Sequence, residues 1–333
     1  RFYFTHPRLE LNPMSAAEPL ADHWFLTGPT ASGKTSVGLE LARRINAEIA
    51  SLDSMAVYRG LDIGTAKPTP GQRQAAAHHL IDLVDPDQEF SLAEYLAAAE
   101  RIVAEIAARG RETLFTGGTP LYLKALLRGI FEGPPADWSL RRRLQAQAGE
   151  RGPDWLHAQL AAVDPVAADR LHPNDERRLV RALEVFEKTG RPISTWQQQF
   201  DRARPAEACK VFVLDWPRDV LCARIDARVE QMFAAGLVAE VEAVLAAGKT
   251  FGRTARQALG YREVLEHLEG RRNLAETIDL VKTRTRQFAK RQLTWFRSLS
   301  ECRWIPLDES LSPAEVAERI LNSIAGQGSI GTT

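Results

Sequence analysis

The sequence lacks the features that mark several large classes of protein. It has no net charge, with 43 Lys and Arg residues against 43 Asp and Glu residues. Overall charge therefore gives no sign of a nucleic-acid partner, and such a partner would have to be argued from local basic patches. Its three cysteines, Cys209, Cys222 and Cys302, stand at unrelated spacings, which disfavours a disulfide framework and a zinc site. No apolar run approaches the roughly 18 residues of a membrane span. We therefore expect a protein of the reducing cytoplasm that has no membrane association.

The length of 333 residues exceeds one ordinary domain and predicts a main domain with an insertion or second lobe. Residues 1–20 are expected to be an N-terminal extension with little order, and Met14 is a candidate natural start. Residues 21–132 and 206–325 carry the strand patterns and are expected to form the core. Residues 133–205 show only helical patterning and are expected to form a helical insertion domain.

Five short apolar runs predict strands at residues 23–27, 48–53, 112–116, 210–215 and 302–307. Helical spacing follows the first run, and a capping box at Ser91–Glu94 opens a second helix that stops at Gly110. His78 and His79 are expected at the edge of a strand rather than as metal ligands. Alternation of strand and helix predicts an α/β fold with a parallel sheet flanked by helices.

A phosphate-binding motif follows the first predicted strand and precedes a predicted helix. In such a loop, successive backbone N–H groups point inward at a helix N-terminus and bind an anion. A lysine adds charge and a threonine hydroxyl can hold Mg²⁺. The motif predicts a P-loop NTPase-like core, and its eight residues are Gly28, Pro29, Thr30, Ala31, Ser32, Gly33, Lys34 and Thr35.

Asp53 is the acid best placed at the end of a strand close behind this loop. Most P-loop proteins hold Mg²⁺ through an acid that ends a later strand, whereas the strand at 112–116 runs into Gly117-Gly118-Thr119. Asp53 has three possible roles: to orient a metal, to act as a general base, or to cap its turn through Ser54.

Four segments together resemble the tRNA dimethylallyltransferases (isopentenyl transferases). The Ala56 position carries Gln in many members, and the chain ends without the Cys/His spacing of the zinc finger found in eukaryotic relatives, so the resemblance is to the bacterial form. The segments are residues 28–35, residues 53–60 continuing into D-I-G-T-A-K-P at 62–68, residues 117–122, and the group at 172–175, 178–184 and 260–263.

This resemblance implies a prenyltransferase. Its donor would be dimethylallyl diphosphate, and its acceptor the N6 amine of the adenosine 3′ of the anticodon. Asp53 would be the general base, while Thr119, Arg262 and Mg²⁺ on Thr35 would stabilise the leaving diphosphate. The adenosine would leave its stack and enter a tunnel opposite the donor. A monomer is expected.

The anticodon stem-loop of tRNA is the expected macromolecular partner, bound by basic side chains and by segments that the family uses. A helix at 280–300 aligns three cations at i, i+4 and i+8. The insertion adds a cluster of arginines. The resemblance adds the segments at residues 53–56 and 257–262, which contact tRNA in the family. The expected tRNA-binding residues are Asp53, Ser54, Met55, Ala56, Arg141, Arg177, Arg178, Leu179, Val180, Arg181, Gln257, Ala258, Leu259, Gly260, Tyr261, Arg262, Lys282, Arg286 and Lys290.

Three alternative functions remain open at this point. A P-loop kinase would use Asp53 to activate a hydroxyl, but it would leave the basic helix at 280–300 unexplained. A prenyltransferase acting on free AMP or ADP would not need the insertion. A tRNA-binding protein without catalysis would need neither Lys34 nor Asp53.

Overall fold

The structure is a computed structural model that describes residues 20–129, 133–196 and 203–325. It divides the chain into two compact units, one containing residues 20–127 and 203–333 and the other containing residues 128–202. We call the first the core unit and the second the helical unit, and describe each by itself. The expected disorder of the N-terminal extension concerns residues 1–19, which lie outside the described residues.

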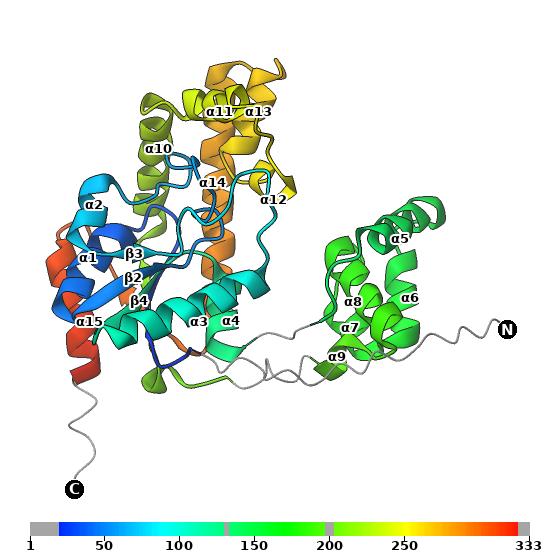
Figure 1. Cartoon of the computed structure of the whole chain (residues 1–333), viewed down its shortest axis with the longest axis horizontal. Helices are drawn as coiled ribbons and strands as arrows, with labels where there is room; N and C mark the ends of the chain where they lie inside the picture. The colour runs from blue at the N-terminus through cyan, green and yellow to red at the C-terminus, as the bar shows by residue number, and fades with distance from the viewer. Residues whose placement is uncertain (1–19, 130–132, 197–202, 326–333) are drawn as a thin grey trace, which may run out of the picture. The chain divides into compact units, whose positions relative to one another are not determined.

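The core unit contains a parallel sheet with the strand order β3-β2-β4-β1-β5-β6 (Figure 1). The predicted α/β fold is confirmed, and all five predicted strands are present within two residues of their expected limits. A sixth strand, β3, lies at the sheet edge, where the two histidines were expected. The strands are β1 (Trp24–Thr27), β2 (Ala47–Ser51), β3 (His78–His79), β4 (Glu112–Gly117), β5 (Lys210–Asp215) and β6 (Cys302–Pro306).

Helices α1 (Lys34–Arg44) and α15 (Pro313–Ala325) cover one face of the sheet. Side chains alternate along β1, so Trp24 and Leu26 pack on Leu41 and Ile320 in this layer. The other face carries Phe25, which stacks on Phe115 of β4 with ring centroids 5.0 Å apart. Because β1 is buried on both faces, it reads in the sequence as a continuous apolar run.

A helical lobe of the core unit extends beyond the sheet (Figure 1). Within it, α10 packs on α14, and α11 and α13 pack on each other. The remaining helices of the core unit are α2 (Pro70–Ala75), α3 (Leu92–Ala108), α4 (Pro120–Arg128), the short η2 (Ala206–Ala208), α10 (Arg218–Ala234), α11 (Leu237–Ala246), α12 (Arg253–Arg256), α13 (Tyr261–Leu268) and α14 (Leu274–Arg297).

The helical unit contains α5 (Trp138–Arg151), α6 (Trp155–Val163), α7 (Pro165–Arg170), α8 (Glu176–Thr189) and α9 (Ile193–Trp196). Leu179 and Val180 of α8 are 0% and 3% exposed and belong to its apolar core. The prediction that these two side chains contact tRNA is therefore wrong. A helix with an apolar stripe buries that stripe, and only its polar face remains accessible.

Two of the arginines predicted to bind tRNA hold the helical unit together. Glu184 of α8 is fully buried and accepts hydrogen bonds from Arg141 of α5, whose Nη2 lies 2.7 Å from Oε2, and from Arg181. Both guanidinium groups therefore balance a buried carboxylate and are not free to bind phosphate. Arg178 pairs with Asp175 at 3.3 Å on the surface, and Arg177 is exposed.

Candidate active site

The phosphate-binding motif forms a loop between β1 and α1. Three of its residues have positive φ: Gly28 at 148°, Ala31 at 63° and Gly33 at 88°. A Cβ atom at Gly28 would lie 3.0 Å from the Leu214 carbonyl oxygen on the adjacent strand, so the first glycine permits a close backbone approach. This geometry turns the loop over the N-terminus of α1, where N–H groups and the helix dipole favour an anion.

Lys34 lies inside the loop. Its Nζ donates hydrogen bonds to the carbonyl oxygens of Gly28 at 3.0 Å and Pro29 at 2.6 Å. Burial and, to a smaller extent, the nearby Arg228 lower the pKa of Lys34 to about 7, while Asp53 acts in the opposite direction. An anion in the loop would restore the charged ammonium, because opposite charges favour ionisation.

Two side chains of the core unit hold the loop from outside, and sequence analysis missed both. Trp216 donates from Nε1 to the Ser32 carbonyl oxygen at 2.9 Å. Arg224 of α10 donates from Nε to the Ala31 carbonyl oxygen at 3.0 Å and stacks over the Trp216 ring at 4.5 Å. These bonds hold the Ala31 and Ser32 carbonyl groups on the outside of the loop.

Arg228 is a second missed residue of α10, one helical turn beyond Arg224. It lines the same cavity as Lys34 and Asp53. Its pKa is lowered by burial and raised by Asp53, so the three charged groups act on one another. The i, i+4 pair Arg224 and Arg228, in the segment that follows the strand predicted at 210–215, was the only signal in the sequence.

Asp53 lies after β2 and faces this cavity. Its Oδ1 accepts a hydrogen bond from the Met55 N–H at 2.8 Å, so the carboxylate does cap its turn, but through Met55 rather than Ser54. Among the described residues, only this oxygen is engaged by a protein donor. The capping role therefore leaves the second oxygen to interact with a ligand.

Thr119 joins the Gly117–Thr119 loop to the loop that carries Asp53. Its Oγ1 accepts a hydrogen bond from the Ser54 N–H at 3.1 Å and lies 3.4 Å from Ser54 Oγ. The Thr119 N–H donates to the Leu52 carbonyl oxygen at 3.1 Å. A Cβ atom at Gly117 would lie 2.2 Å from the same carbonyl oxygen, so only glycine fits here.

These loops border one cavity of about 560 Å³, entirely within the core unit. Gly28, Pro29 and Ala31 shape the phosphate loop without lining the cavity, and Lys282, Arg286 and Lys290 do not line it either. The predicted residues that do line it are Thr30, Ser32, Gly33, Lys34, Thr35, Asp53, Ser54, Met55, Ala56, Thr119, Gln257, Ala258, Leu259, Gly260, Tyr261 and Arg262.

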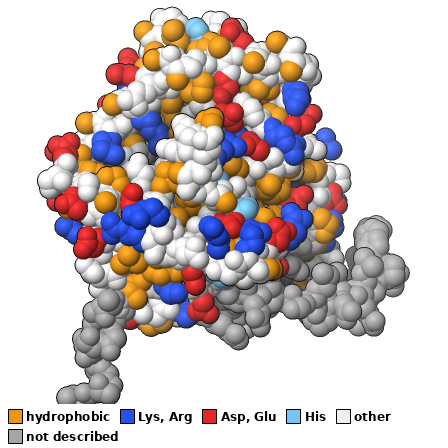
Figure 2. All heavy atoms as spheres, turned by 60° about the vertical axis from the view of Figure 1, so that its left-hand side comes forward, with side chains coloured by type: hydrophobic (Ala, Val, Ile, Leu, Met, Phe, Trp, Pro, Cys, Tyr) orange, Lys and Arg blue, Asp and Glu red, His pale blue; other side chains and the backbone are white. Residues whose placement is uncertain are grey.

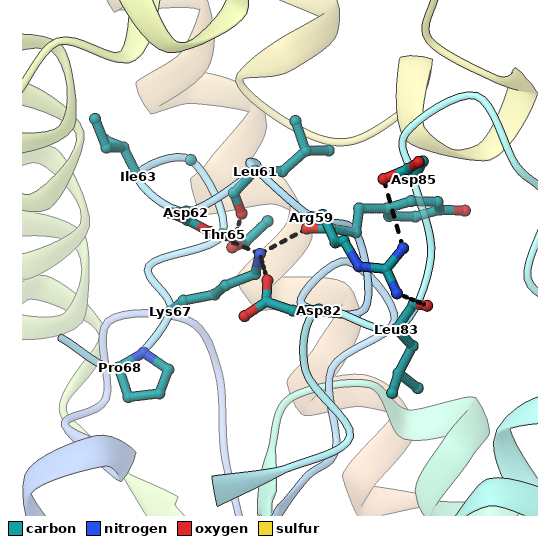
Figure 3. Close-up of polar contacts among 12 residues, drawn as sticks. Arg59, Leu61, Asp62, Ile63, Thr65, Lys67, Pro68, Asp82, Leu83 and Asp85 are labelled. Atoms are coloured by element: carbon teal, nitrogen blue, oxygen red, sulfur yellow. Dashed lines mark hydrogen bonds and ion pairs between the residues drawn. The ribbon is translucent and has the colours of Figure 1, made fainter. Parts of the chain in front are cut away.

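The segment at 62–68 forms one wall of the cavity and is fixed by a buried lysine (Figure 3). The Lys67 ammonium donates to the Tyr58 carbonyl oxygen at 2.6 Å, to Asp62 Oδ1 at 2.7 Å and to Asp82 Oδ1 at 2.6 Å. All three of its donors are satisfied, so the motif lysine is a structural cation with no donor left for substrate.

Glu240 of α11 holds the same wall from the other side. Its carboxylate accepts hydrogen bonds from the N–H groups of Asp62 at 2.9 Å and Ile63 at 2.7 Å and from the Tyr261 hydroxyl at 2.6 Å. A Cβ atom at Gly64 would lie 2.5 Å from the Tyr261 ring. Tyr261 is fully buried, and its hydroxyl supports the wall through Glu240.

The cation predicted at Arg262 is already paired. Its Nη2 lies 3.0 Å from Oε1 of Glu263, a fully buried carboxylate that also pairs with Arg284. Arg262 and Arg228 both line the cavity. Arg228 is the cation that lowers the pKa of Lys34.

The basic stripe predicted on α14 is mostly neutralised by α10. Lys282 pairs with Glu230 at 2.6 Å, and Arg286 pairs with Asp226 at 2.5 Å. Lys290 is exposed. Two of the three cations predicted to bind tRNA therefore have acidic partners within the protein. Spacing within α14 does not reveal these pairs, because the partners lie on a separate helix.

The residues present fit a Mg²⁺ ion that is held mainly by substrate. Thr35 and Asp53 bring one hydroxyl and one carboxylate to the same cavity. In the described part of the chain, no three His, Cys, Asp or Glu side chains gather in a group that could bind a metal by themselves. Mg²⁺ commonly takes one or two protein oxygens and completes its shell with phosphate oxygens and water.

None of the helices that the structure describes has the length and apolar character needed to cross a membrane.

Comparison with known proteins gives one consistent result. A family model described as IPP transferase matches residues 56–299. A protein named tRNA dimethylallyltransferase from Geobacter metallireducens is 48% identical over 281 residues, covering 84% of this chain and 91% of that protein. Another of that name, from Rhodopirellula baltica, is 46% identical over 318 residues, covering 92% of this chain and 95% of that protein.

Solved structures agree with the sequence comparisons. The crystal structure of the full-length tRNA isopentenylpyrophosphate transferase from Bacillus halodurans aligns with a TM-score of 0.65 at 36% identity, over 93% of this chain and 99% of that one. A eukaryotic dimethylallyltransferase described as acting on tRNA aligns with a TM-score of 0.74 at 26% identity, over 93% of this chain and 81% of that one. The resemblance inferred from the four motif segments is confirmed, and the chain belongs to the IPP transferase family.

Proposed function

We propose that the protein transfers a dimethylallyl group from dimethylallyl diphosphate to the N6 amine of the adenosine 3′ of the anticodon in tRNA, releasing diphosphate. The observation that carries this proposal is the meeting of an anion loop and the Asp53 loop in one cavity. The names of the relatives from Geobacter metallireducens and Rhodopirellula baltica supply the reaction and the tRNA acceptor.

On the donor side, the allylic C1–O bond breaks and its electron pair leaves with the diphosphate. Catalysis then requires donors and cations that are already aimed at the departing charge. Lys34, Arg228 and the loop N–H groups at the start of α1 lie where they would provide this stabilisation. The hydroxyl of Thr119 would approach the bridging oxygen. Mg²⁺ held by Thr35 would offset part of the diphosphate charge.

On the acceptor side, the adenine amine is a poor nucleophile because its lone pair is delocalised into the ring. As the N6–C1 bond forms, the amine must lose a proton, and a carboxylate within hydrogen-bond reach can accept it. Asp53 is the proposed base, through the oxygen that does not cap Met55. The adenosine would leave its stack to reach the cavity.

Basic side chains in each unit are candidates for contacts with the anticodon arm. In the helical unit, Arg177 and Arg178 remain exposed after Arg141 and Arg181 are assigned to Glu184. In the core unit, Lys290 is the exposed member of the α14 stripe, and Arg291 beside it lines the cavity. Such contacts to phosphates give affinity without reading sequence.

One assay tests the proposal. The protein is incubated with radiolabelled dimethylallyl diphosphate, Mg²⁺ and either tRNA or AMP, and in parallel with γ-labelled ATP and the same acceptors. Label that enters tRNA at N6 of the adenosine supports the proposal. Label from the prenyl donor in AMP alone, or from ATP in either acceptor, would replace it with a nucleotide prenyltransferase or a kinase.

A further inference from the structure

Gln292 of α14 is a buried amide that bridges two loops of the active site. It is 3% exposed. Its Oε1 accepts a hydrogen bond from the Thr30 N–H in the phosphate loop at 3.0 Å. Its Nε2 donates to the carbonyl oxygen of Gly118 at 2.5 Å. One side chain therefore uses both ends of its amide to join the loop after β1 to the loop after β4.

This bridge continues to Asp53. Gly118 precedes Thr119, whose hydroxyl oxygen accepts from the Ser54 N–H at 3.1 Å, next to Asp53. A path of hydrogen bonds and single peptide units thus leads from the loop that would hold the leaving group to the carboxylate that would take the proton.

Backbone pairing between these segments stops before the loops begin. The last paired positions of β1 and β4 are Thr27 and Gly117, where Thr27 Oγ1 also donates to the Gly117 carbonyl oxygen at 2.8 Å. Beyond these positions, the Gln292 side chain packs closely against the backbone of Gly118. A Cβ atom at Gly118 would lie 2.6 Å from Gln292 Nε2 and 3.2 Å from the Gly28 carbonyl oxygen.

The bridge also assigns one donor of the phosphate loop to the protein. Because the Thr30 N–H points at Gln292, it holds the loop in place, while the N–H groups nearer α1 and Lys34 remain for the anion. Gln292 therefore has little reason to alter the strength of diphosphate binding.

We propose that Gln292 is a positioning residue that fixes the distance between the diphosphate loop and the loop carrying Asp53, and so the alignment of donor and acceptor. This inference rests on the proposed prenyl transfer. A reaction that joins two bound substrates depends steeply on their relative placement, and a misplacement of about 1 Å can cost roughly 10²-fold in rate.

Two variants separate the bridge from simple filling of space. Gln292→Met keeps the length of the side chain and removes both hydrogen bonds, whereas Gln292→Asn keeps the amide but is one methylene too short to reach both loops. Gln287→Met is the matched control, because Gln287 is exposed on the same helix. Thermal unfolding of each variant sets an assay temperature at which all are folded.

For Gln292→Met and Gln292→Asn we expect kcat of prenyl transfer to tRNA to fall about 10- to 100-fold. The KM for dimethylallyl diphosphate, and the Kd for inorganic diphosphate with Mg²⁺ measured by calorimetry, should change less than about threefold. Gln287→Met should match the wild type in all three quantities.

An unchanged kcat in either variant would overturn the inference. So would a Kd for inorganic diphosphate that weakens by the same factor as kcat, because Gln292 would then merely support the anion site. A wild-type protein that transfers no prenyl group to tRNA would refute the proposed function itself. The two failures are distinguishable, because the first is seen in the variants and the second in the wild type.

Discussion

Asp53 and Lys34 enter the cavity from different loops, and each already has partners within the protein. One oxygen of Asp53 caps the turn at Met55, and the Lys34 ammonium donates to two carbonyl groups of its own loop. Such internal bonds hold both groups in position before substrate arrives, so little reorganisation is needed during the reaction.

Replacement of Asp53 by alanine should slow the chemical step while binding is retained. We expect kcat to fall by about 10²–10⁴-fold, since a general base contributes on that order. Single-turnover transfer to tRNA measures the chemistry, and calorimetry with inorganic diphosphate and filter binding of tRNA measure the two affinities. Asp87→Ala, at an exposed position, is the control. Equal single-turnover rates for Asp53→Ala and wild type would dismiss the assignment as base.

Sequence alone predicted the residues whose chemistry is local. The phosphate loop and Asp53 each need only a strand end and a turn, which short patterns specify. Arg228 and Gln292 were missed because their roles depend on how α10 and α14 pack against the loop. The ion pairs of Lys282 and Arg286 were missed for the same reason, since their acidic partners lie on α10.

Among the elements of the cavity wall, the 62–68 segment contains turns and no helix or strand, and two charged side chains hold it. Lys67 binds it from within (Figure 3). Glu240 of α11 accepts hydrogen bonds from its N–H groups. The D-I-G-T-A-K-P motif was recognised from the sequence. The acceptor for its backbone N–H groups is Glu240, which lies 177 and 178 residues away from Ile63 and Asp62 in the sequence.

Glu240→Ala should destabilise the core unit and loosen this wall. The change leaves two strongly bonded N–H groups and the Tyr261 hydroxyl without their acceptor. We expect the free energy of unfolding to fall by about 2 kcal/mol. Urea denaturation followed by fluorescence measures it, with Glu242→Ala on the exposed side of α11 as the control. Identical denaturation midpoints for the two variants would contradict the role assigned to Glu240.

Glu48 gives the sheet edge a defined acid sensitivity. On β2 it accepts two hydrogen bonds from Arg109 of α3, at 2.9 and 2.8 Å, and lies 2.6 Å from Nε2 of His79 on β3. The hydrogen bonds from Arg109 lower the pKa of Glu48 to about 2. A carboxylate with a lowered folded-state pKa stabilises the fold above its unfolded pKa and loses that contribution as pH falls through the folded value.

Glu48→Gln should therefore flatten the acid limb of the stability curve. Wild-type protein should lose more unfolding free energy than Glu48→Gln between pH 5 and pH 3, the window in which the unfolded carboxyl binds its proton first. Urea titrations of both proteins at the two pH values provide the comparison. A larger loss in the variant than in the wild type would show that the sign is wrong.

For the whole molecule, the proposed tRNA binding has to be explained without a net positive charge. Positive and negative side chains are interspersed over the face drawn in Figure 2, and many cations elsewhere are paired. The helical unit contains both kinds of arginine, with Arg141 bound to the buried Glu184 and Arg177 exposed. The sequence predicted the cluster of arginines but could not distinguish the paired arginine from the exposed one, because both positions carry the same residue type.

Arg177→Ala should change tRNA affinity without changing stability, whereas Arg141→Ala should change stability. Arg177→Ala should weaken tRNA binding and reduce the slope of log K against log salt concentration by about 1, with no change in Tm. Arg141→Ala should lower Tm, because it removes one partner of a buried carboxylate. Filter binding between about 50 and 200 mM salt and scanning calorimetry make the comparison. A salt slope unaffected by Arg177→Ala would remove this residue from the interface.

The strand order has a consequence for synthesis on the ribosome. β1 is central in the finished sheet, between β4 and β5, yet β5 begins only at Lys210, after the whole helical unit has been translated. Until then β1, which leads into the phosphate loop, has an unpaired edge, and open edges invite pairing with other chains. A chain truncated near residue 205 would contain the helical unit and β1 to β4, but neither β5 nor β6. Such a chain should aggregate, whereas a chain extended through β5 should not.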